Sequence, residues 1–412
     1  MQQRTPPTSK ASPMKDSDLE VYSVGGAVRD DLLGLPVNDR DWVVVGSTPE
    51  AMIARGYKPV GKDFPVFLNP STHEEYALAR TERKTKSGYR GFAINASPEV
   101  TLSQDLLRRD FTINAIARDM DGRLIDPHNG ITDLRAGILR HVSPAFSEDP
   151  VRILRAARFV ARFGFSVSPE TLALMREMVK GGEVDALVPE RTWQELARGL
   201  MEKNPSRFFT TLRNCGALAR ALPEIDALFN TSMTPEKSNG VNYGTHAMLA
   251  LDDAAQHGHP LAVRFSVLAH NVARIKGDAD LLRTMCLRLR ATNECRDLGL
   301  LMAHYYSEIQ RVLELGHDSI IDLLQNCDAW RRPQRFTHLL QACASNARTL
   351  SEVSQKDYPQ ADHLLRVLAA TQAVDVKTIA QQCPDKGLIA EKIRKARTAA
   401  AEQAITKRAS HK

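Results

Sequence analysis

The sequence lacks long hydrophobic runs and closely spaced cysteine pairs. Among its 412 residues there is no run of about 18 uncharged apolar residues, so we predict no transmembrane helix. The six cysteines are scattered without a C-x-x-C pair, as expected for reduced, buried thiols in a cytoplasmic protein. Residues 1–19 are polar and have no apolar core, so we predict a disordered extension rather than a signal peptide.

Composition is that of an ordinary globular protein. Hydrophobic residues make up 43% of the chain and charged residues 25%, and the length allows about two to four domains. The net charge of +6 permits a polyanionic partner, but many proteins of this charge bind no nucleic acid. The positive charge therefore supports nucleic-acid binding only if sequence motifs indicate that function independently.

The most informative stretch is residues 21–45. A β-prone run at 21–24 ends in a Gly-Gly pair at 25–26, which lets backbone N–H groups approach a ligand closely. Residues 27–33 favour a short helix, and residues 41–45 favour a second strand. The predicted order is therefore strand, glycine turn, helix and strand.

Asp39 and Asp41 lie two residues apart where the second strand begins. Side chains alternate along a strand, so we expect both carboxylates on one face, where they repel unless a cation lies between them. Mg²⁺ prefers such oxygen ligands, and Arg29, one turn after the glycine pair, offers donors to phosphate. The alternative is a solvated Asp-Arg-Asp loop. The ordered combination resembles nucleotidyltransferases of the DNA polymerase beta superfamily and predicts metal-assisted nucleotidyl transfer.

A second motif is RRDFTIN, residues 108–114. We predict Arg108 and Arg109 at the start of a helix, where their guanidinium groups can clamp a triphosphate. Asn114 follows Asp110 by four residues, so the two are expected on one face. The alternative for an isolated RRD is a surface ion-pair cluster.

A third motif is EDPVRILRAAR, which is expected to begin a helix. Asp149 is predicted to cap this helix, with Pro150 at its first position. Arg152, Arg155 and Arg158 recur every three residues and form a slowly drifting stripe on one face. The alternative is a solvated arginine face.

In this order, GGAVRD, DRD, RRDFTIN and EDPVRILRAAR resemble the class II CCA-adding enzymes, which are tRNA nucleotidyltransferases, here of the bacterial type. The resemblance covers roughly residues 20–230. It implies addition of C, C and A to the 3′ end of tRNA from CTP and ATP, with Mg²⁺ as cofactor. It also implies that Asp39 and Asp41 are the catalytic residues and hold the metal. The nucleotide-binding residues that it implies are Gly26, Arg29, Arg109, Asp149, Arg152, Arg155 and Arg158.

The resemblance assigns base selection to Asp149 and Arg152, and the chemistry of this pair agrees. Cytosine and adenine both present an exocyclic amine beside a ring nitrogen, so a carboxylate accepts from the amine and a guanidinium donates to the nitrogen. Guanine and uracil place a carbonyl oxygen where the amine would be. The resulting unpaired or repelled group excludes them.

The expected fold class is α+β: a polymerase-beta-like head with a mixed sheet, then a helical neck, body and tail. The expected domains are the head at 20–145, the neck at 146–205, the body at 206–335 and a tRNA-contacting tail at 336–412. Within the head we predict a helix at 49–54 and strands at 57–60, 66–68 and 76–79. Residues 80–97 are basic and aperiodic, so we predict a mobile loop that helps the change from C to A addition.

The body departs from the metal-dependent HD phosphohydrolase pattern that some of these enzymes carry. His246 fits the first position, but Asn271 follows His270 where the pattern has Asp. A neutral amide lacks the charge that divalent metals need from that ligand. We therefore expect an HD-derived body without metal or phosphohydrolase activity.

Other functions stay open from the sequence alone. A bacterial poly(A) polymerase shares the head but usually has a long basic extension, and only the short basic stretch 392–412 occurs here. An enzyme that adds only CC or only A, a non-catalytic RNA-binding protein and an HD phosphohydrolase are further alternatives. The expected partner is tRNA, through its 3′ end and acceptor region, with no membrane. A monomer is favoured, although the sequence does not fix the oligomeric state.

Overall fold

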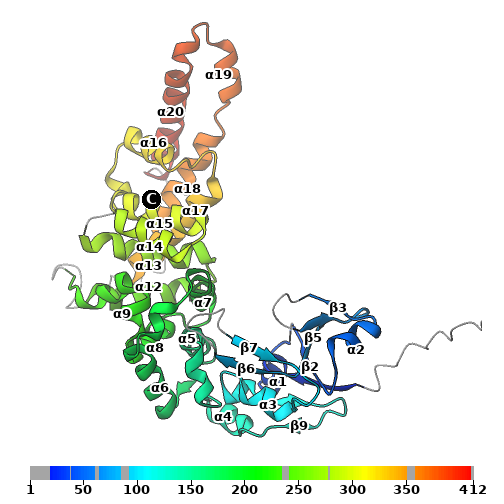
Figure 1. The fold of residues 1–412 in the computed structure, drawn as a ribbon. Helices are drawn as coiled ribbons and strands as arrows, with labels where there is room; N and C mark the ends of the chain where they lie inside the picture. The colour runs from blue at the N-terminus through cyan, green and yellow to red at the C-terminus, as the bar shows by residue number, and fades with distance from the viewer. Residues whose placement is uncertain are drawn as a thin grey trace, which may run out of the picture. The chain divides into compact units, whose positions relative to one another are not determined.

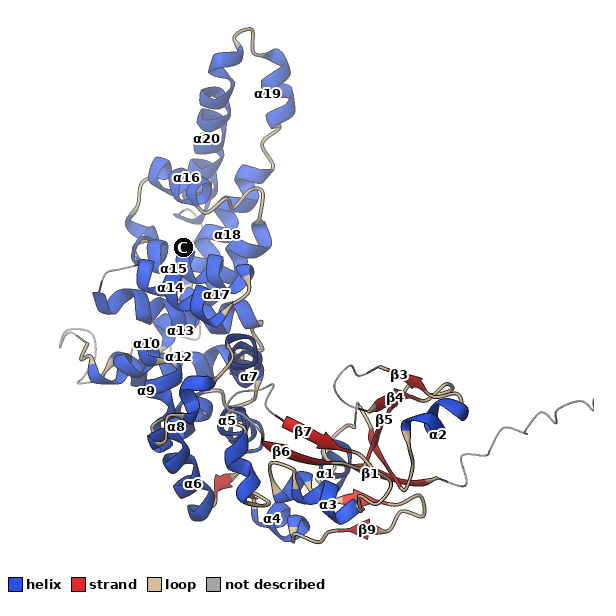
Figure 2. Ribbon diagram, viewed as in Figure 1, coloured by secondary structure: helices blue, strands red, loops and turns tan. Residues whose placement is uncertain are grey.

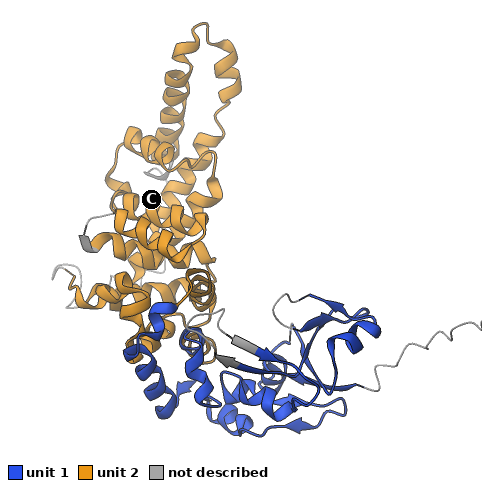
Figure 3. Cartoon of the chain, viewed as in Figure 1, with its two compact units in different colours: residues 1–156, 165–186 blue, residues 157–164, 187–412 orange. Residues whose placement is uncertain are grey.

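The chain forms two structural units. The computed structural model describes residues 19–37, 39–60, 65–84, 92–233, 241–276, 279–349 and 358–409. The predicted N-terminal extension lies outside these residues, apart from its last position. Unit 1 comprises residues 1–156 and 165–186, and unit 2 comprises residues 157–164 and 187–412 (Figure 3). The finer division into head, neck, body and tail stays a prediction.

A seven-stranded mixed sheet is the frame of unit 1 in the described residues (Figure 2). Its strands are β1 (Glu20–Val24), β2 (Asp41–Val45), β3 (Lys58–Pro59), β4 (Val66–Leu68), β5 (Glu75–Leu78), β8 (Ala117–Arg118) and β9 (Leu124–Ile125). The strand order is β3-β4-β5-β2-β1-β8-β9. β2 pairs antiparallel with β1 and parallel with β5, which confirms the mixed sheet expected for an α+β head.

The other elements of unit 1 are short helices and a parallel strand pair. They are α1 (Gly26–Leu32), α2 (Pro49–Ala54), α3 (Leu102–Leu107), η2 (Thr112–Asn114), α4 (Gly130–Ala136), β10 (Ile138–Leu139), η3 (Pro144–Glu148), α5 (Val151–Phe163), β11 (Ser166–Val167), α6 (Pro169–Lys180) and η4 (Glu183–Ala186). β10 pairs with β11, although α5 separates them in the sequence. α5 itself begins in unit 1 and ends in unit 2.

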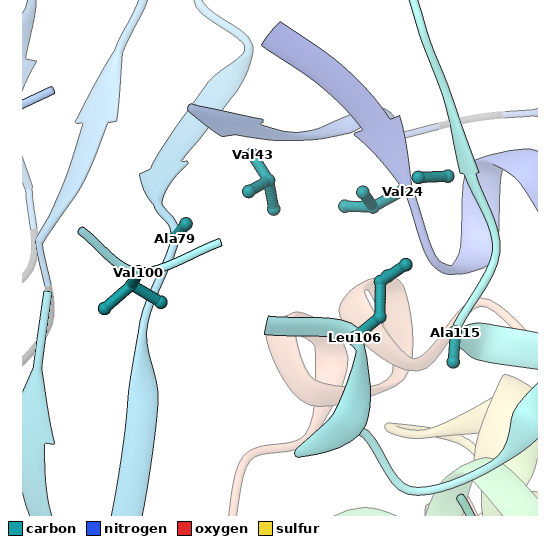
Figure 4. Close-up of a cluster of buried hydrophobic side chains, with 7 residues drawn as sticks. Val24, Val43, Ala79, Val100, Leu106 and Ala115 are labelled. Atoms are coloured by element: carbon teal, nitrogen blue, oxygen red, sulfur yellow. The ribbon is translucent and has the colours of Figure 1, made fainter. Parts of the chain in front are cut away.

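Both faces of the central strands are buried. Side chains alternate along β2, so Val43 joins one hydrophobic cluster and Val44 joins another on the opposite face. The first cluster also holds Val24 and Leu106, which Figure 4 shows beside Val43. The second holds Met52, from α2. Packing on both faces fixes β2, and with it the carboxylate at its first position.

Residues 80–97 contain a β-hairpin, so the predicted loop is wrong at both flanks. β6 (Thr81–Lys84) pairs antiparallel with β7 (Phe92–Asn95) in a separate two-stranded sheet. The prediction of a strand from sequence depends on an alternating apolar pattern. β6 and β7 lack this pattern and are defined by the hydrogen bonds between their backbones, so the sequence did not indicate them. Residues 85–91, at the centre of the predicted loop, lie outside the described residues.

Unit 2 is built from helices throughout its described residues (Figure 1). Among the described residues, the α-helices that begin in unit 2 are α7 (Pro189–Met201), α8 (Ser206–Cys215), α9 (Ala217–Ala221), α10 (Pro223–Asp226), α12 (Tyr243–Gln256), α13 (Leu261–Lys276), α14 (Ala279–Leu289), α15 (Asn293–Gln310), α16 (His317–Asn326), α17 (Pro333–Arg348), α18 (Pro359–Gln372), α19 (Val376–Gln382) and α20 (Ile389–Ala409). α13 packs against α12, α15 and α17. The helical region expected after the head is therefore confirmed in unit 2, whereas β11 (Ser166–Val167) is a strand within the expected neck. Within the described ranges, no helix combines the length and apolar character that a membrane crossing requires.

Candidate active site

Asp41 begins β2 beside the glycine turn. Its partner in the antiparallel pair is Val24, the last residue of β1, which directly precedes Gly25. Asp39 lies before the strand, so the strand alternation used to predict its orientation applies only from Asp41 onward. Both residues are exposed, and in the described part of the chain neither carboxylate forms an ion pair. Both are therefore open to a cation.

A third carboxylate, not identified from the sequence, neighbours Asp41. In the parallel pairing of β2 with β5, Glu75 lies directly beside Asp41 and is exposed. The described residues contain no group of three acids, histidines or cysteines arranged to hold a metal by themselves. Mg²⁺ does not need such a group, because it usually takes one or two carboxylates, substrate phosphates and waters. The carboxylates at the start of β2 therefore fit Mg²⁺.

The glycine turn and Arg109 are in close contact. Gly25 has a φ of +68°, and a Cβ there would lie 2.8 Å from Arg109 Nη1, so only glycine fits. The same Nη1 donates to the main-chain oxygen of Asn114 at 3.4 Å, and Nη2 donates to Asp105 at 3.1 Å. Nε of Arg109 is buried without a hydrogen-bond partner. This guanidinium thus rests against the turn with donors to spare for phosphate.

Arg108 has a different environment from its neighbour. α3 ends just before it, so the prediction that the arginine pair starts a helix is wrong, and the pair follows a helix instead. The helix begins earlier because Thr101 and Gln104 form a capping box. Nε of Arg108 donates to the Arg80 carbonyl at 3.0 Å, and Nη1 donates to Glu82 at 2.9 Å. Arg108 is therefore engaged with the base of the β6–β7 hairpin.

Asp105 joins the two arginines from within α3. Its side chain is fully buried, and it accepts from Arg108 Nη2 at 2.7 Å and from Arg109 Nη2 at 3.1 Å. Burial alone would raise the pKa of Asp105, but the charges of the two arginines lower it, so the carboxylate is ionised. The i, i+3 and i, i+4 spacing of Asp105, Arg108 and Arg109 is the sequence signal for this role.

Arg29 lies buried in the first turns of α1, with 4% of its surface exposed. Its Nε donates to Asp30 at 2.8 Å, and its Nη1 donates to Asn114 Oδ1. Gly26, the first residue of α1, lies close by, because a Cβ there would be 3.5 Å from Arg29 Nη2. The structure thus brings Arg29 and Gly26 together and ties the guanidinium to neighbouring side chains.

Asp110 is held by three donors. Asn114 Nδ2 donates to Oδ1 at 2.9 Å, Arg155 Nε donates to Oδ2 at 2.7 Å, and the Phe111 N–H donates at 2.9 Å. Burial alone would raise the pKa of Asp110, but the charge of Arg155 and the hydrogen bond from Asn114 lower it to about 2. The expected contact between Asp110 and Asn114 is confirmed, across the short η2 helix.

The start of α5 matches the predicted cap. Asp149 Oδ1 accepts from the Val151 N–H at 3.1 Å. Arg152 Nη1 donates to the Ala145 carbonyl at 3.0 Å, and Nη2 donates to the Arg108 carbonyl at 2.8 Å. These contacts orient the guanidinium and use two of its five N–H groups, so donors remain for a base.

Arg158, one turn beyond Arg155, belongs to unit 2. Its Nε donates to Glu195 on α7 at 2.6 Å, and both side chains are nearly buried. Arg152, Arg155 and Arg158 therefore have three different sets of acceptors. The alternative of a solvated arginine face does not describe this helix.

The predicted HD-like residues lie in the core of unit 2. His246, His270 and Asn271 are each at most 1% exposed. His246 Nε2 lies 3.2 Å from the Asn346 carbonyl oxygen, and Asn271 Nδ2 donates to the Val267 carbonyl at 2.9 Å. Burial lowers the pKa of His270 to about 3, so its imidazole is neutral. With an amide in place of a carboxylate, this donor set does not fit a divalent metal.

Comparison with known families and structures gives consistent matches. The Poly A polymerase head domain matches residues 21–140, and the probable RNA and SrmB-binding site of polymerase A matches residues 164–229. The CCA-adding enzyme of Bacillus stearothermophilus, solved with CTP, superposes with a TM-score of 0.67 at 20% identity, covering 94% of this chain and 90% of that one. The Thermotoga maritima enzyme, solved with tRNA, gives 0.64 at 20% identity, covering 95% and 92%. At these identities the likeness shows the fold alone.

Two relatives are much more similar in sequence. The multifunctional CCA protein of Chromobacterium violaceum is 56% identical over 395 residues, covering 92% of this chain and 97% of the relative. That of Laribacter hongkongensis is 55% identical over 400 residues, covering 94% and 99%. Given this identity over nearly the whole length of both, the chain belongs to the family of multifunctional CCA proteins.

Proposed function

We propose that this chain appends C, C and A to the 3′ end of tRNA from CTP and ATP, with Mg²⁺ as its cofactor. The observation that carries the proposal is the position of Asp41, paired with the strand end that leads into the glycine turn and Arg109. The name of the relatives supports CCA as the product. The substrates are supported by CCA-adding enzymes of the same fold that were solved with CTP and with tRNA. The six free, buried cysteines agree with an enzyme of the cytoplasm.

In the proposed reaction the 3′-hydroxyl oxygen of the RNA attacks the α-phosphorus of the nucleotide. The new oxygen–phosphorus bond forms, the bond to pyrophosphate breaks, and the hydroxyl proton passes to solvent. Mg²⁺ held by Asp39 and Asp41 lowers the pKa of the hydroxyl and offsets the charge of the phosphates when it is bound. Arg109 and the backbone at Gly26 bind the triphosphate and orient it for attack.

In this proposal Asp149 and Arg152 select the base of the incoming nucleotide. Both lie at the start of α5, where main-chain contacts orient them before a nucleotide arrives. Preorganised donors and acceptors of this kind favour cytosine and adenine over uracil and guanine. Arg155 and Arg158 are also proposed to contact the nucleotide, although in this structure Arg155 binds Asp110 and Arg158 binds Glu195.

A bacterial poly(A) polymerase is the second candidate, because the family that matches residues 21–140 is the Poly A polymerase head domain. The test is extension of a tRNA transcript that lacks its CCA end, with Mg²⁺ and with CTP and ATP supplied singly and together. We expect two C residues with CTP alone and one further A with both, after which extension stops. A run of A residues without any C would favour the second candidate, and no extension would contradict both.

We expect no phosphohydrolase activity from the His246–His270–Asn271 cluster. The residues are buried, and Asn271 supplies no charge to a divalent ion. The measurement is phosphate release from a 2′,3′-cyclic nucleotide and from a phosphomonoester, with Mg²⁺, Mn²⁺, Co²⁺ or Ni²⁺ added in turn. CCA addition by the same sample serves as the control for folding. Metal-dependent release that an Asn271→Ala variant loses would overturn this expectation.

A further inference from the structure

Asn114 contacts two arginines and an aspartate of the candidate site. The residue is 6% exposed. Its Oδ1 accepts from Arg29 Nη1, and its Nδ2 donates to Asp110 Oδ1 at 2.9 Å. Its main-chain oxygen accepts from Arg109 Nη1 at 3.4 Å. One residue thus contacts both arginines expected near phosphate, and the carboxylate that holds Arg155.

An amide suits this position because its two ends face opposite charges. Oδ1 is an acceptor and faces the guanidinium of Arg29, whereas Nδ2 is a donor and faces the carboxylate of Asp110. A carboxylate in place of the amide would meet a second carboxylate. An apolar side chain would leave both buried charges short of a partner.

The contacts of Asn114 complete a continuous series between two helices. Asp30 and Arg29 lie on α1, which follows the glycine turn. Asp110 and Arg155 form the other end, and Arg155 lies on α5, three residues after Arg152. Asn114 is the only described side chain that bonds to both Arg29 and Asp110.

We propose that Asn114 is a positioning residue that couples the phosphate-binding part of the nucleotide site to the base-selecting start of α5. This inference rests on the proposed nucleotidyl transfer. Asn114 holds Arg29 and Arg109 on one side and the Asp110–Arg155 pair on the other. Its loss therefore impairs nucleotide binding, and the position of the tRNA is unaffected.

The sharpest test is Asn114→Asp, which keeps the size of the side chain. Two carboxylates within hydrogen-bond distance share one proton, so the apparent pKa of the pair is raised above that of a lone Asp. Below this pKa the shared proton restores the hydrogen bond, and above it the two charges repel. We expect the ratio of variant to wild-type kcat/KM for CTP to fall about tenfold between pH 5.5 and pH 8.5.

Asn69→Asp is the matched control. Asn69 is also 6% exposed and lies in the same unit, but its oxygen accepts from the N–H groups of Ser71 and Thr72, and its Nδ2 donates to the Tyr57 hydroxyl. Asp at this position meets no carboxylate among these partners and keeps both acceptor roles. We expect its kcat/KM ratio to wild type to stay constant over the same pH range.

Asn114→Ala supplies a second readout in case Asn114→Asp folds poorly. We expect KM for CTP and for ATP to rise about tenfold while KM for tRNA changes less than twofold. If Asn114 had only a structural role, its replacement by Ala would lower the fraction of active enzyme and the melting temperature. The KM values for CTP and ATP would then be unchanged. An unchanged KM for the nucleotides, or a loss in Asn114→Asp that is equal at both pH values, would overturn the inference. If wild type itself extends no tRNA, the proposed function fails instead.

Discussion

Replacing Asp41 by Asn is expected to lower kcat for C addition by about 10³-fold or more. The amide is the same size as the carboxylate but lacks the charge that we propose binds Mg²⁺ beside the phosphates. Asp41 is exposed and has no ion pair with a described residue, so its replacement should leave the fold intact. Single-turnover extension of a tRNA that lacks CCA measures the chemical step directly.

Asp121→Asn serves as the control for loss of one charge from the same unit. Asp121 is exposed in the turn between β8 and β9, and it is not one of the residues proposed to bind metal or nucleotide. We expect its kcat to equal that of wild type, and both variants to keep the wild-type melting temperature. Full activity of Asp41→Asn at low Mg²⁺ concentration would show that this carboxylate holds no catalytic metal.

Replacing Asp149 by Ala is expected to reduce discrimination against UTP by about 10²-fold or more. Without the carboxylate, nothing in the proposed pair repels the carbonyl oxygen that uracil places where cytosine has its amine. The quantity to measure is the ratio of kcat/KM for CTP to that for UTP, in wild type and variant. The same change should admit GTP at the A step.

Asp149 also caps α5, so its loss has a structural effect that must be separated. Replacing a capping Asp by Ala destabilises a helix by about 1 kcal/mol, whereas Ser keeps the cap. Asp149→Ser should therefore retain stability and still lose base discrimination. If Asp149→Ser discriminates as wild type does, the carboxylate does not select the base.

Elements with one clear apolar pattern could be predicted from the sequence. Asp41–Val45 forms β2 at the bounds expected because its run of valines favours a strand. Pro49–Ala54 forms α2 at the bounds expected because Thr48 caps it and Pro49 suits its first position. Pro169–Lys180 forms α6 for the same reason, with Ser168 as its cap. These elements can be predicted from neighbouring residues alone, without knowledge of tertiary contacts.

Other features depend on contacts between distant residues and were missed. The β6–β7 hairpin has no alternating apolar face, so its strands are defined by pairing alone. Both arginines bind Asp105, but which of them also binds Glu82 and which lies against Gly25 depends on where α3 ends. The hydrogen bond that Arg29 donates to Asn114 joins residues 85 positions apart, and no spacing rule predicts it.

The division of the chain into units has a consequence for synthesis on the ribosome. Unit 1 contains residues 165–186, so its sequence is interrupted by residues 157–164, which belong to unit 2. β10 can gain its parallel partner only after β11 has emerged. Elongation at about 5–20 residues per second takes about 2–6 seconds to pass from residue 156 to residue 186. During this interval the nascent unit 1 lacks the strand that pairs with β10, so it cannot complete its fold.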